Sequence, residues 1–334
     1  MRAGLAIFLV AFFSTATVFA DIKDESKGHV ANVLDGKQVL INMTNAKKAL
    51  NYQGTVVFLR NGKLETMKYF HASAKDAEQE RLVSLNSPMR EIIRDANQVS
   101  CHFKSTHQTV VDYRPFEQSF LLDIPQDIEK LIEAYSFDII GEENIAMKPA
   151  YVLAIQPRDK LRYFRKIWIE KQHFLPLKVV IYDFVGMPLE QVLFTELEIV
   201  DSLPFVNVDL ANKERQSTLT QAEKPASFEQ AAFIVHQLPH GFQEIFFTRS
   251  PVRNSDQLVD HMVLSDGFSS VSVYMENKNT PLESGLHSIG AVNSFSRPIG
   301  DFELTVMGEV PAETVKFIAE GIKLRNQDVG GEIR

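Results

Sequence analysis

The sequence predicts a two-domain protein of the α+β class. Its length of 334 residues suits about two domains of ordinary size. Short extended runs outnumber helical stretches, and a polar segment at residues 207–226 separates two regions that each have their own apolar pattern. With 45% hydrophobic and 23% charged residues, both regions can form hydrophobic cores.

Residues 1–20 have the composition of a secretory signal peptide. Arg2 precedes an apolar run, and small and hydroxyl-bearing residues then lead to Ala20, after which we expect cleavage. A membrane anchor is the alternative. It needs about 20 continuous apolar residues, whereas Ser14 interrupts this run early. No cysteine directly follows the cleavage site, so we expect the mature protein to be free in its compartment.

Charge and cysteine content exclude several classes of function. A net charge of -8 does not suit a protein that neutralises nucleic acid phosphates. The single cysteine, Cys101, excludes an intrachain disulfide and any metal cluster held by several thiolates. We expect Cys101 to be a buried small side chain rather than a reactive thiol.

The first domain is predicted to begin with a helix and an antiparallel meander. Apolar residues in 37–50 recur every three or four positions, which is typical of one helix face. Asn61-Gly62 lies between two extended runs, and this dipeptide favours a type I′ hairpin turn. Further strands are predicted at 80–86, 89–95, 98–104 and 106–111.

A second helix is predicted at 126–135, where Ile128, Leu131 and Tyr135 share one face. More strands are expected at 136–141, 150–156, 163–170, 176–184 and 189–200. The stretch 177–184 is apolar on both faces, whereas a sheet with one wet face should alternate. Two interpretations stay open: an ordinary covered central strand, or a strand that borders a second layer or an internal cavity.

Residues 207–226 have little apolar periodicity and are interpreted as a linker. Beyond them, 268–275 alternates cleanly and 302–306 repeats that pattern, so both are predicted strands. Pro311 is expected to open a final helix with Val315 and Ile318 in its buried stripe. Residues 227–334 contain 8 basic and 14 acidic residues, so this region holds most of the excess negative charge.

The sequence contains few signs of catalysis. It has no Gly-x-Gly, no complete phosphate loop, no Gly-x-Ser-x-Gly and no His-Glu-x-x-His, so neither a cofactor nor a metal is predicted. His261, Asp266 and Ser269 are the residue types of a hydrolytic triad. They lie in one predicted strand-turn-strand segment, however, and a triad requires convergent geometry. Asp266-Gly267 is more simply a hairpin turn.

A basic cluster interleaved with aromatic residues lies between positions 158 and 171. It contains Arg158, Lys160, Arg162, Arg165, Lys166 and Lys171, with Tyr163, Phe164 and Trp168 among them. It could bind lipid phosphates. The simpler interpretation, which we favour, is a solvated hairpin face whose aromatic side chains point inward.

Several short motifs follow one another in a specific order along the chain. The first domain carries Tyr52-Gln53-Gly54-Thr55, the Asn61-Gly62 hairpin, Glu80-Arg81-Leu82, Ile167-Trp168-Ile169, Leu175-Pro176-Leu177-Lys178, Leu189-Glu190-Gln191 and Phe194-Thr195. The second carries Leu238-Pro239-x-Gly241-Phe242, the run His261–Glu276 and Gly308-Glu309-Val310-Pro311. Each string is weak alone, but their order covers essentially the whole mature chain. This order resembles that of the RseB/MucB family of exported negative regulators of the sigma-E pathway.

The resemblance implies an architecture and a binding function. The first domain would be a large open antiparallel β-barrel capped by helices, similar to lipoprotein carriers, and the second a smaller α+β domain. The protein would bind the periplasmic segment of an anti-sigma factor, RseA or MucA, and hinder its regulated cleavage. Lipopolysaccharide or mislocalised lipoprotein would release it. The family has no catalytic residues to carry over.

These implications lead to expected domains, sites and alternatives. The expected segments are a signal peptide (1–20), a half-barrel domain (21–206), a linker (207–226), an anti-sigma-binding domain (227–325) and a disordered tail (326–334). Candidates for a lipid cavity are Val57, Leu59, Trp168, Val180, Tyr182 and Phe184. Candidates for partner binding are Phe242, Phe268, Ser270, Ser272 and Tyr274. A periplasmic location and a homodimer fit this view, and a lipid or lipoprotein carrier is the main alternative.

Overall fold

The structure is a computed structural model that describes most of residues 34–325. Within this range the positions left out are 76, 96–97, 114–118, 123–127, 210, 212–217, 222–223, 252–257 and 279–283. The predicted signal peptide and the predicted C-terminal tail lie outside the described residues.

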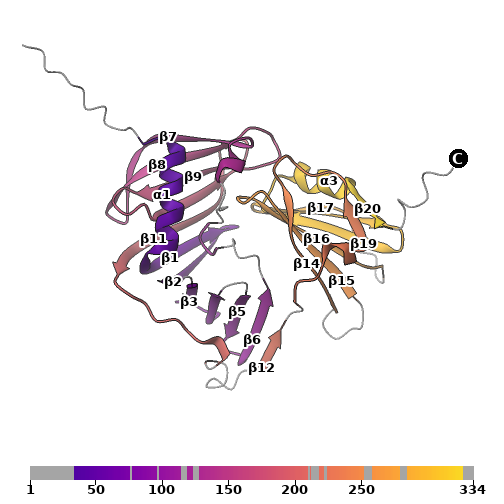
Figure 1. Ribbon diagram of the computed structural model, residues 1–334, viewed down its shortest axis with the longest axis horizontal. Helices are drawn as coiled ribbons and strands as arrows, with labels where there is room; N and C mark the ends of the chain where they lie inside the picture. The colour runs from indigo at the N-terminus through magenta and orange to yellow at the C-terminus, as the bar shows by residue number, and fades with distance from the viewer. Residues whose placement is uncertain are drawn as a thin grey trace, which may run out of the picture. The chain divides into compact units, whose positions relative to one another are not determined.

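One helix covers part of one side of a large sheet. Helix α1 (Gly36–Ala49) begins after Asp35, whose carboxylate accepts the backbone N–H of Gln38 at 2.7 Å. Its buried stripe, Val39, Leu40 and Met43, packs against apolar side chains of the sheet. Figure 1 shows α1 lying across the strands at that end of the sheet. The predicted helix at 37–50 is therefore confirmed.

Among the described residues, the large sheet contains twelve strands. They are β1 (Asn51–Arg60), β2 (Lys63–Ala74), β3 (Ala77–Ser84), β4 (Arg90–Asp95), β5 (Gln98–Phe103), β6 (Gln108–Tyr113), β7 (Tyr135–Ile145), β8 (Lys148–Pro157), β9 (Phe164–Glu170), β10 (Pro176–Tyr182), β11 (Pro188–Val200) and β12 (Thr218–Gln221). Their order is β12-β6-β5-β4-β3-β2-β1-β11-β10-β9-β8-β7, so among the described residues the sheet is open and does not close into a barrel. We call this sheet together with α1 the first lobe.

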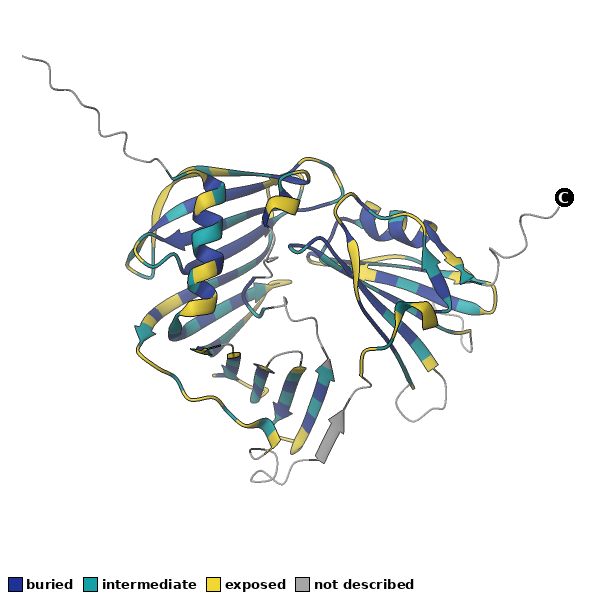
Figure 2. Cartoon of the chain, in the orientation of Figure 1, coloured by how far each residue is buried: buried dark blue, intermediate teal, exposed yellow. Residues whose placement is uncertain are grey.

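The hairpin predicted at Asn61-Gly62 is confirmed. Both residues have positive φ, 52° and 69°, as a type I′ turn requires. The register pairs Arg60 with Lys63 across this turn. Along β1 buried and half-buried residues alternate, and Figure 2 shows similar alternation along neighbouring strands. The other strands predicted up to residue 200 are also present, with ends shifted by a few residues.

The helix predicted at 126–135 is wrong for its described part. Residues Ile128–Leu131 form a single turn of 3-10 helix, and β7 already begins at Tyr135. Ile128 and Leu131 are three positions apart, so one such turn places both in the core beneath α1. A longer helix adds nothing to that burial, and the backbone of Tyr135 pairs with Pro157 of β8 instead.

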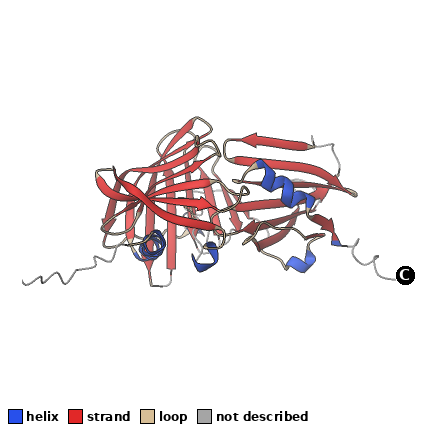
Figure 3. Cartoon of the chain, turned by 90° about the horizontal axis from the view of Figure 1, so that it is seen from above, coloured by secondary structure: helices blue, strands red, loops and turns tan. Residues whose placement is uncertain are grey.

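A second, smaller sheet forms the other lobe. Its strands are β14 (Gln243–Pro251), β15 (Leu258–Ser265), β16 (Ser270–Asn277), β17 (Gly285–Ile289), β18 (Val292–Ile299) and β19 (Phe302–Gly308), in the order β14-β15-β16-β19-β18-β17. Helix α3 (Ala312–Glu320) covers one side, and β13 (Phe233–Val235) pairs with β20 (Ile322–Leu324) nearby. We call this unit the second lobe. Strands dominate the described parts of both lobes (Figure 3).

The predicted final helix and the two strands at 268–275 and 302–306 are confirmed. The predicted linker differs from a featureless segment, since it contains β12, which pairs in parallel with β6 at the edge of the large sheet. A segment with few apolar residues can still add such an edge strand, because the ladder uses only backbone N–H and C=O groups.

Candidate functional site: a cavity and a polar latch between the lobes

A cavity of about 560 Å³ lies between the two sheets. From the first lobe it is lined by Arg60, Arg165, Val179, Ile181, Glu190, Gln191, Val192 and the segment Ser119–Leu122. From the second lobe it is lined by Val263, Phe268, Ser270, Ser272, Tyr274, Val292, Met307, Gly308 and Glu309. The lining combines apolar side chains with charged and hydroxyl-bearing ones, and this mixture suits a small amphipathic ligand.

Strand register determines which side of the large sheet lines the cavity. Val179 lies opposite Val192 on β11 and opposite Ile167 on β9, so these three side chains share one side. Val179 and Ile167 also belong to the core beneath α1. We call this the helix-facing side and the opposite one the outer side. The apolar residues of the cavity on β10 and β11 therefore continue the surface that α1 covers elsewhere.

The second lobe contributes the polar side of its sheet. Val271, Val273 and Met275 point into the core with α3, so the alternate residues of β16 point the other way. Ser272 and Tyr274 are two of these, and both line the cavity. The imidazole of His261 on the neighbouring strand stacks on Tyr274, with 4.3 Å between ring centroids. This polar side therefore meets the apolar helix-facing side across the cavity.

A group of charged residues lies within the cavity. Glu190 is buried and forms an ion pair with Arg60, in which Arg60 Nε and Glu190 Oε2 are 2.9 Å apart. Burial and the nearby negative charge of Glu309 raise the pKa of Glu190 to about 7, although the positive charges of Arg60 and Arg165 oppose this. At neutral pH the cavity therefore holds a carboxyl group close to its titration midpoint.

Substituting Glu190 by glutamine should flatten the pH dependence of stability. Because the pKa in the folded state exceeds the ordinary glutamate value of about 4.5, the folded state binds this proton more tightly than the unfolded state. Its stabilisation, up to about 3 kcal/mol, is fully present below pH 4.5 and is lost as the pH rises through 7. Urea unfolding across this range should show that slope in the wild type and not in Glu190→Gln. The same substitution at exposed Glu196 is the control, and an unchanged slope in Glu190→Gln would contradict the assignment.

A polar latch joins the lobes beside the cavity. Arg162 is completely buried, and its Nε donates to Asp266 Oδ2 at 2.5 Å. The hydroxyl group of Tyr135 donates to the same oxygen at 2.8 Å. Arg162 also bonds Asp159 and the carbonyl of His240. We call Arg162, Asp266 and Tyr135 the latch, because they connect β7 and the β8–β9 loop to the β15–β16 turn.

The favoured interpretation of the basic cluster is wrong for two of its members. Arg162 and Arg165 are buried rather than solvated, and both bond to the second lobe: Arg162 to Asp266, and Arg165 to Ser269 at 3.2 Å. Sequence alone could not separate them from Lys160 and Lys166, because burial of an arginine depends on a partner carboxylate or hydroxyl supplied by a distant segment.

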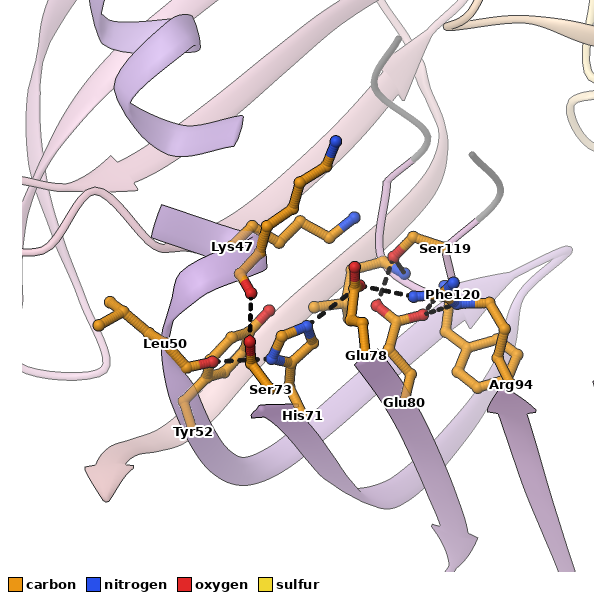
Figure 4. Close-up of polar contacts among 12 residues, drawn as sticks. Lys47, Leu50, Tyr52, His71, Ser73, Glu78, Glu80, Arg94, Ser119 and Phe120 are labelled. Carbon is orange, nitrogen blue, oxygen red and sulfur yellow. Dashed lines mark hydrogen bonds and ion pairs between the residues drawn. The ribbon is translucent and has the colours of Figure 1, made fainter. Parts of the chain in front are cut away.

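A second buried polar network holds a wall of the cavity in place (Figure 4). Glu80 is fully buried and accepts hydrogen bonds from Arg94 Nε at 2.8 Å and from the Tyr69 hydroxyl at 2.8 Å. Burial alone would raise the pKa of Glu80, but the charges of Arg94 and Lys47 outweigh it and hold this pKa well below its usual range. Glu80 is thus a carboxylate at any physiological pH.

This network also fixes the segment Ser119–Leu122. Ser119 Oγ donates to Glu80 at 2.6 Å, and the backbone N–H of Phe120 donates to the same carboxylate at 3.1 Å. Lys47 on α1 donates to the carbonyl of Leu122 at 2.9 Å. The segment Ser119–Leu122 lines the cavity. Glu80 and Lys47 therefore hold part of the cavity wall in position, although neither residue lines the cavity itself.

The residues proposed for a lipid cavity do not line the cavity described above. Register places Val57, Leu59, Trp168, Val180 and Tyr182 on the outer side of the large sheet, and Phe184 is exposed in the turn after β10. Trp168 is buried there under Lys178 and donates to Glu143 at 2.8 Å. Of the two apolar faces of β10, the cavity uses the one with Val179 and Ile181. Lipid contact by the six predicted residues stays a prediction.

The residues proposed for partner binding converge on the interface between the lobes. Phe268, Ser270, Ser272 and Tyr274 line the cavity. Phe242 is buried near the latch, with the guanidinium of Arg162 5.2 Å from its ring centroid. Phe268 packs edge-on against Tyr135 at 5.4 Å. The structure brings these five residues together, and their contact with a partner stays a prediction.

Sequence reasoning missed three charged residues of the site, Glu80, Arg94 and Glu190. The sequence did contain a signal for them, because each is a charged residue at a position that the alternation of its strand predicts to be buried. Glu80 and Glu190 both lie in motifs noted for the family resemblance. Their roles needed the partners Arg94 and Arg60, which come from other strands.

The three residues considered for a hydrolytic triad have separate structural partners. His261 Nε2 lies 3.1 Å from Ser272 Oγ. Asp266 belongs to the latch and also accepts the backbone N–H of Ser269 at 2.8 Å, which closes the turn. Ser269 accepts from Arg165. Each is thus engaged in the β15–β16 hairpin or the interface.

Cys101 is free and half-buried, and burial raises the pKa of its thiol.

Across the described ranges, no helix combines the length and the apolar character needed to cross a membrane. Within those same ranges, no cluster of three or more His, Cys, Asp or Glu side chains is arranged to hold a metal ion.

Comparison with known families finds two matching domain models in sequence. The MucB/RseB N-terminal domain matches residues 35–222, and the MucB/RseB C-terminal domain matches residues 227–323. The two matches together cover nearly all of the described chain.

Curated relatives match over most of their length. The sigma-E factor regulatory protein RseB of Haemophilus influenzae is 26% identical over 296 residues, which cover 88% of this chain and 93% of the relative. The sigma factor AlgU regulatory protein MucB of Pseudomonas aeruginosa is 28% identical over 302 residues, covering 86% and 91%.

Solved structures share the fold. MucB in complex with MucA(peri) superposes with a TM-score of 0.67 at 24% identity, covering 87% of this chain and 99% of that one. A structure of MucB without a named partner gives 0.62 at 25% identity, covering 87% and 98%.

Proposed function

Because the chain belongs to the MucB/RseB family, we propose that it regulates a sigma-E-type factor by binding the periplasmic segment of an anti-sigma factor. The observation that carries this proposal is the presence of both family domains, in order, across nearly all of the described chain. The bound segment is protected from regulated proteolysis, so the sigma factor stays sequestered. The protein acts in the periplasm as a soluble protein after removal of residues 1–20.

Release on sensing lipid is the second part of the proposal. The helix-facing side of the large sheet acts as a lipoprotein-carrier-like half-barrel that receives an acyl chain of lipopolysaccharide or mislocalised lipoprotein. Val179, Ile181 and Val192 on one wall and Val263 on the other supply apolar surface. Each methylene moved from water into such surroundings contributes about 0.8 kcal/mol. A chain taken from a bilayer gains almost nothing, so the cavity responds to lipids that are stranded in water.

Phe268 couples the cavity to the contact between the lobes. Its side chain lines the cavity, and its backbone N–H donates to Asp266 Oδ1 of the latch at 3.0 Å. A ligand that displaces Phe268 therefore strains the β15–β16 turn that holds Asp266. The lipid and the anti-sigma segment then bind different arrangements of the lobes, so binding of either one weakens the protein's affinity for the other.

A variant that fills the cavity should separate lipid release from partner binding. Met307 is 37% exposed and lines the cavity, so Met307→Trp takes up ligand space without altering a core. We expect the purified protein to bind the anti-sigma segment, and a soluble lipid A analogue to weaken this complex about tenfold or more. Met307→Trp should keep the affinity for the segment and lose most of the lipid effect. Fluorescence anisotropy of the labelled segment measures both quantities.

The conservative variant Met307→Leu is the control and should behave like the wild type. Unchanged affinity for the segment at saturating lipid would contradict the release mechanism, and absence of segment binding would contradict the regulatory function itself. A lipid or lipoprotein carrier would instead copurify with acylated cargo from periplasmic extract. The proposal allows a homodimer, which analytical ultracentrifugation of the purified protein would detect.

A further inference from the structure

The turn between β10 and β11 displays three large apolar side chains in water. Phe184 is 59% exposed, Val185 83% and Met187 61%. They follow one another around a single tight turn, so together they form a continuous projection. Isolated exposed apolar residues need no explanation, but a contiguous group is typical of an interaction surface.

The conformation of this turn does not require apolar residues. Asp183 Oδ1 accepts the backbone N–H groups of Val185 and Met187 at 3.0 and 2.7 Å, and Gly186 supplies the positive φ of 82°. Asp183 and Gly186 therefore build the turn, as is usual for these residue types. Polar residues at the other positions would serve the turn equally well. The hydrogen bonds hold the apolar projection in one conformation, so little ordering is needed for binding.

Aromatic and lysine side chains surround the base of the projection. Phe164 and Tyr182 pack with ring centroids 5.5 Å apart, and Lys166 Nζ lies 5.3 Å from the Tyr182 centroid. Lys63 is exposed at the β1–β2 turn, which register places beside the start of β11. Acidic residues are also near: Glu143 acts electrostatically on Tyr182, the carboxylate of Asp183 is occupied by the turn, and Glu190 is paired with Arg60.

Two further exposed apolar residues extend this surface. Leu64, 65% exposed, lies opposite Leu59 on the outer side next to the β1–β2 turn. Ile289, 66% exposed, precedes Gly290, which lies so close to the Asn61 side chain that a Cβ there would displace it. The tips of three hairpins thus lie next to one another, and each carries an exposed apolar side chain.

We infer that this surface docks the protein on an anionic phospholipid bilayer. A projecting apolar tip inserts among acyl chains, aromatic rings at its base suit the polar interface, and lysines attract lipid phosphates. A protein partner would more commonly meet a pocket or a flat patch centred on a buried anchor. The inference is independent of the proposed function, because none of its exposed apolar residues lines the cavity or belongs to the latch. Docking keeps the protein at the membrane surface even without a bound partner.

Vesicle cosedimentation of the full mature protein tests this inference. We expect binding to vesicles of phosphatidylethanolamine with phosphatidylglycerol, and weaker binding to phosphatidylcholine vesicles or at high salt. The double variant Val185→Asn with Met187→Asn should bind the anionic vesicles at least about tenfold more weakly than the wild type. Lys63→Ala with Lys166→Ala should weaken binding severalfold and reduce its salt dependence.

Met147→Asn is the matched control, since this methionine is 99% exposed at the β7–β8 turn, away from the proposed surface. It should leave vesicle binding unchanged. Equal binding by the wild type and the tip variant would overturn the inference, as would a wild type that binds no vesicles. Loss of anti-sigma segment binding in the tip variant with vesicle binding intact would also overturn it and reveal a protein-docking surface.

Discussion

Replacing Arg162 by methionine lowers the free energy of unfolding by about 3–5 kcal/mol, because it leaves a buried carboxylate without its cation. Asp266 keeps the Tyr135 hydroxyl and two backbone N–H groups, but these are dipoles rather than a compensating charge. The charge of Arg162 is also shared with Asp159 and the carbonyl of His240. Urea unfolding followed by tryptophan fluorescence measures the change, with Trp168 as the single reporter.

The double variant Arg162→Met with Asp266→Asn should recover part of this loss, since no uncompensated charge then remains buried. Lys316→Ala is the control for a basic side chain in an exposed ion pair. Lys316 lies 3.9 Å from Glu320 and more than half of it is exposed, so we expect a change below about 1 kcal/mol. An Arg162→Met variant as stable as this control would show that the latch does not hold the lobes together.

Replacing Glu80 by glutamine should cost about 2–3 kcal/mol, because Arg94 loses one of its two carboxylate partners and keeps only Glu78, at 2.7 Å. The wall segment Ser119–Leu122 should loosen with it, since Ser119 and the Phe120 N–H both depend on this carboxylate. We therefore expect hydrogen exchange at Phe120 and Leu121 to become faster in Glu80→Gln. Exchange in α3 of the second lobe should stay as in the wild type.

The acid side of the stability curve provides a second measurement of Glu80. Its folded pKa lies below the unfolded value, so its stabilisation is present above about pH 4.5 and is lost as the pH falls below that value. Glu80→Gln should make this acid slope shallower, in a pH window different from that of Glu190, and the lowered pKa of Glu78 leaves part of the slope in place. Glu196→Gln, an exposed partner of Lys68, is the matched control and should keep the full slope. An acid slope as steep in Glu80→Gln as in the wild type would contradict the role of Glu80.

Local patterns in the sequence predicted most of the secondary structure correctly. The Asn61-Gly62 turn, helix α1 and helix α3 depend on interactions between residues a few positions apart, so their signals are readable along the chain. The prediction at 126–135 shows the limit of such signals. The spacing of Ile128 and Leu131 fits a helix, yet the core beneath α1 needs only one turn there.

By itself the sequence determined the order of the elements, the break between two lobes and the membership of the MucB/RseB family. Only the tertiary structure decided which face of β10 borders the cavity and which arginines are buried. Both faces of that strand are apolar, so a period of two residues cannot distinguish Val179 from Val180. Arg162 and Lys160 look alike in a basic segment, because the carboxylate that makes burial of Arg162 tolerable, Asp266, lies about a hundred residues further along the chain.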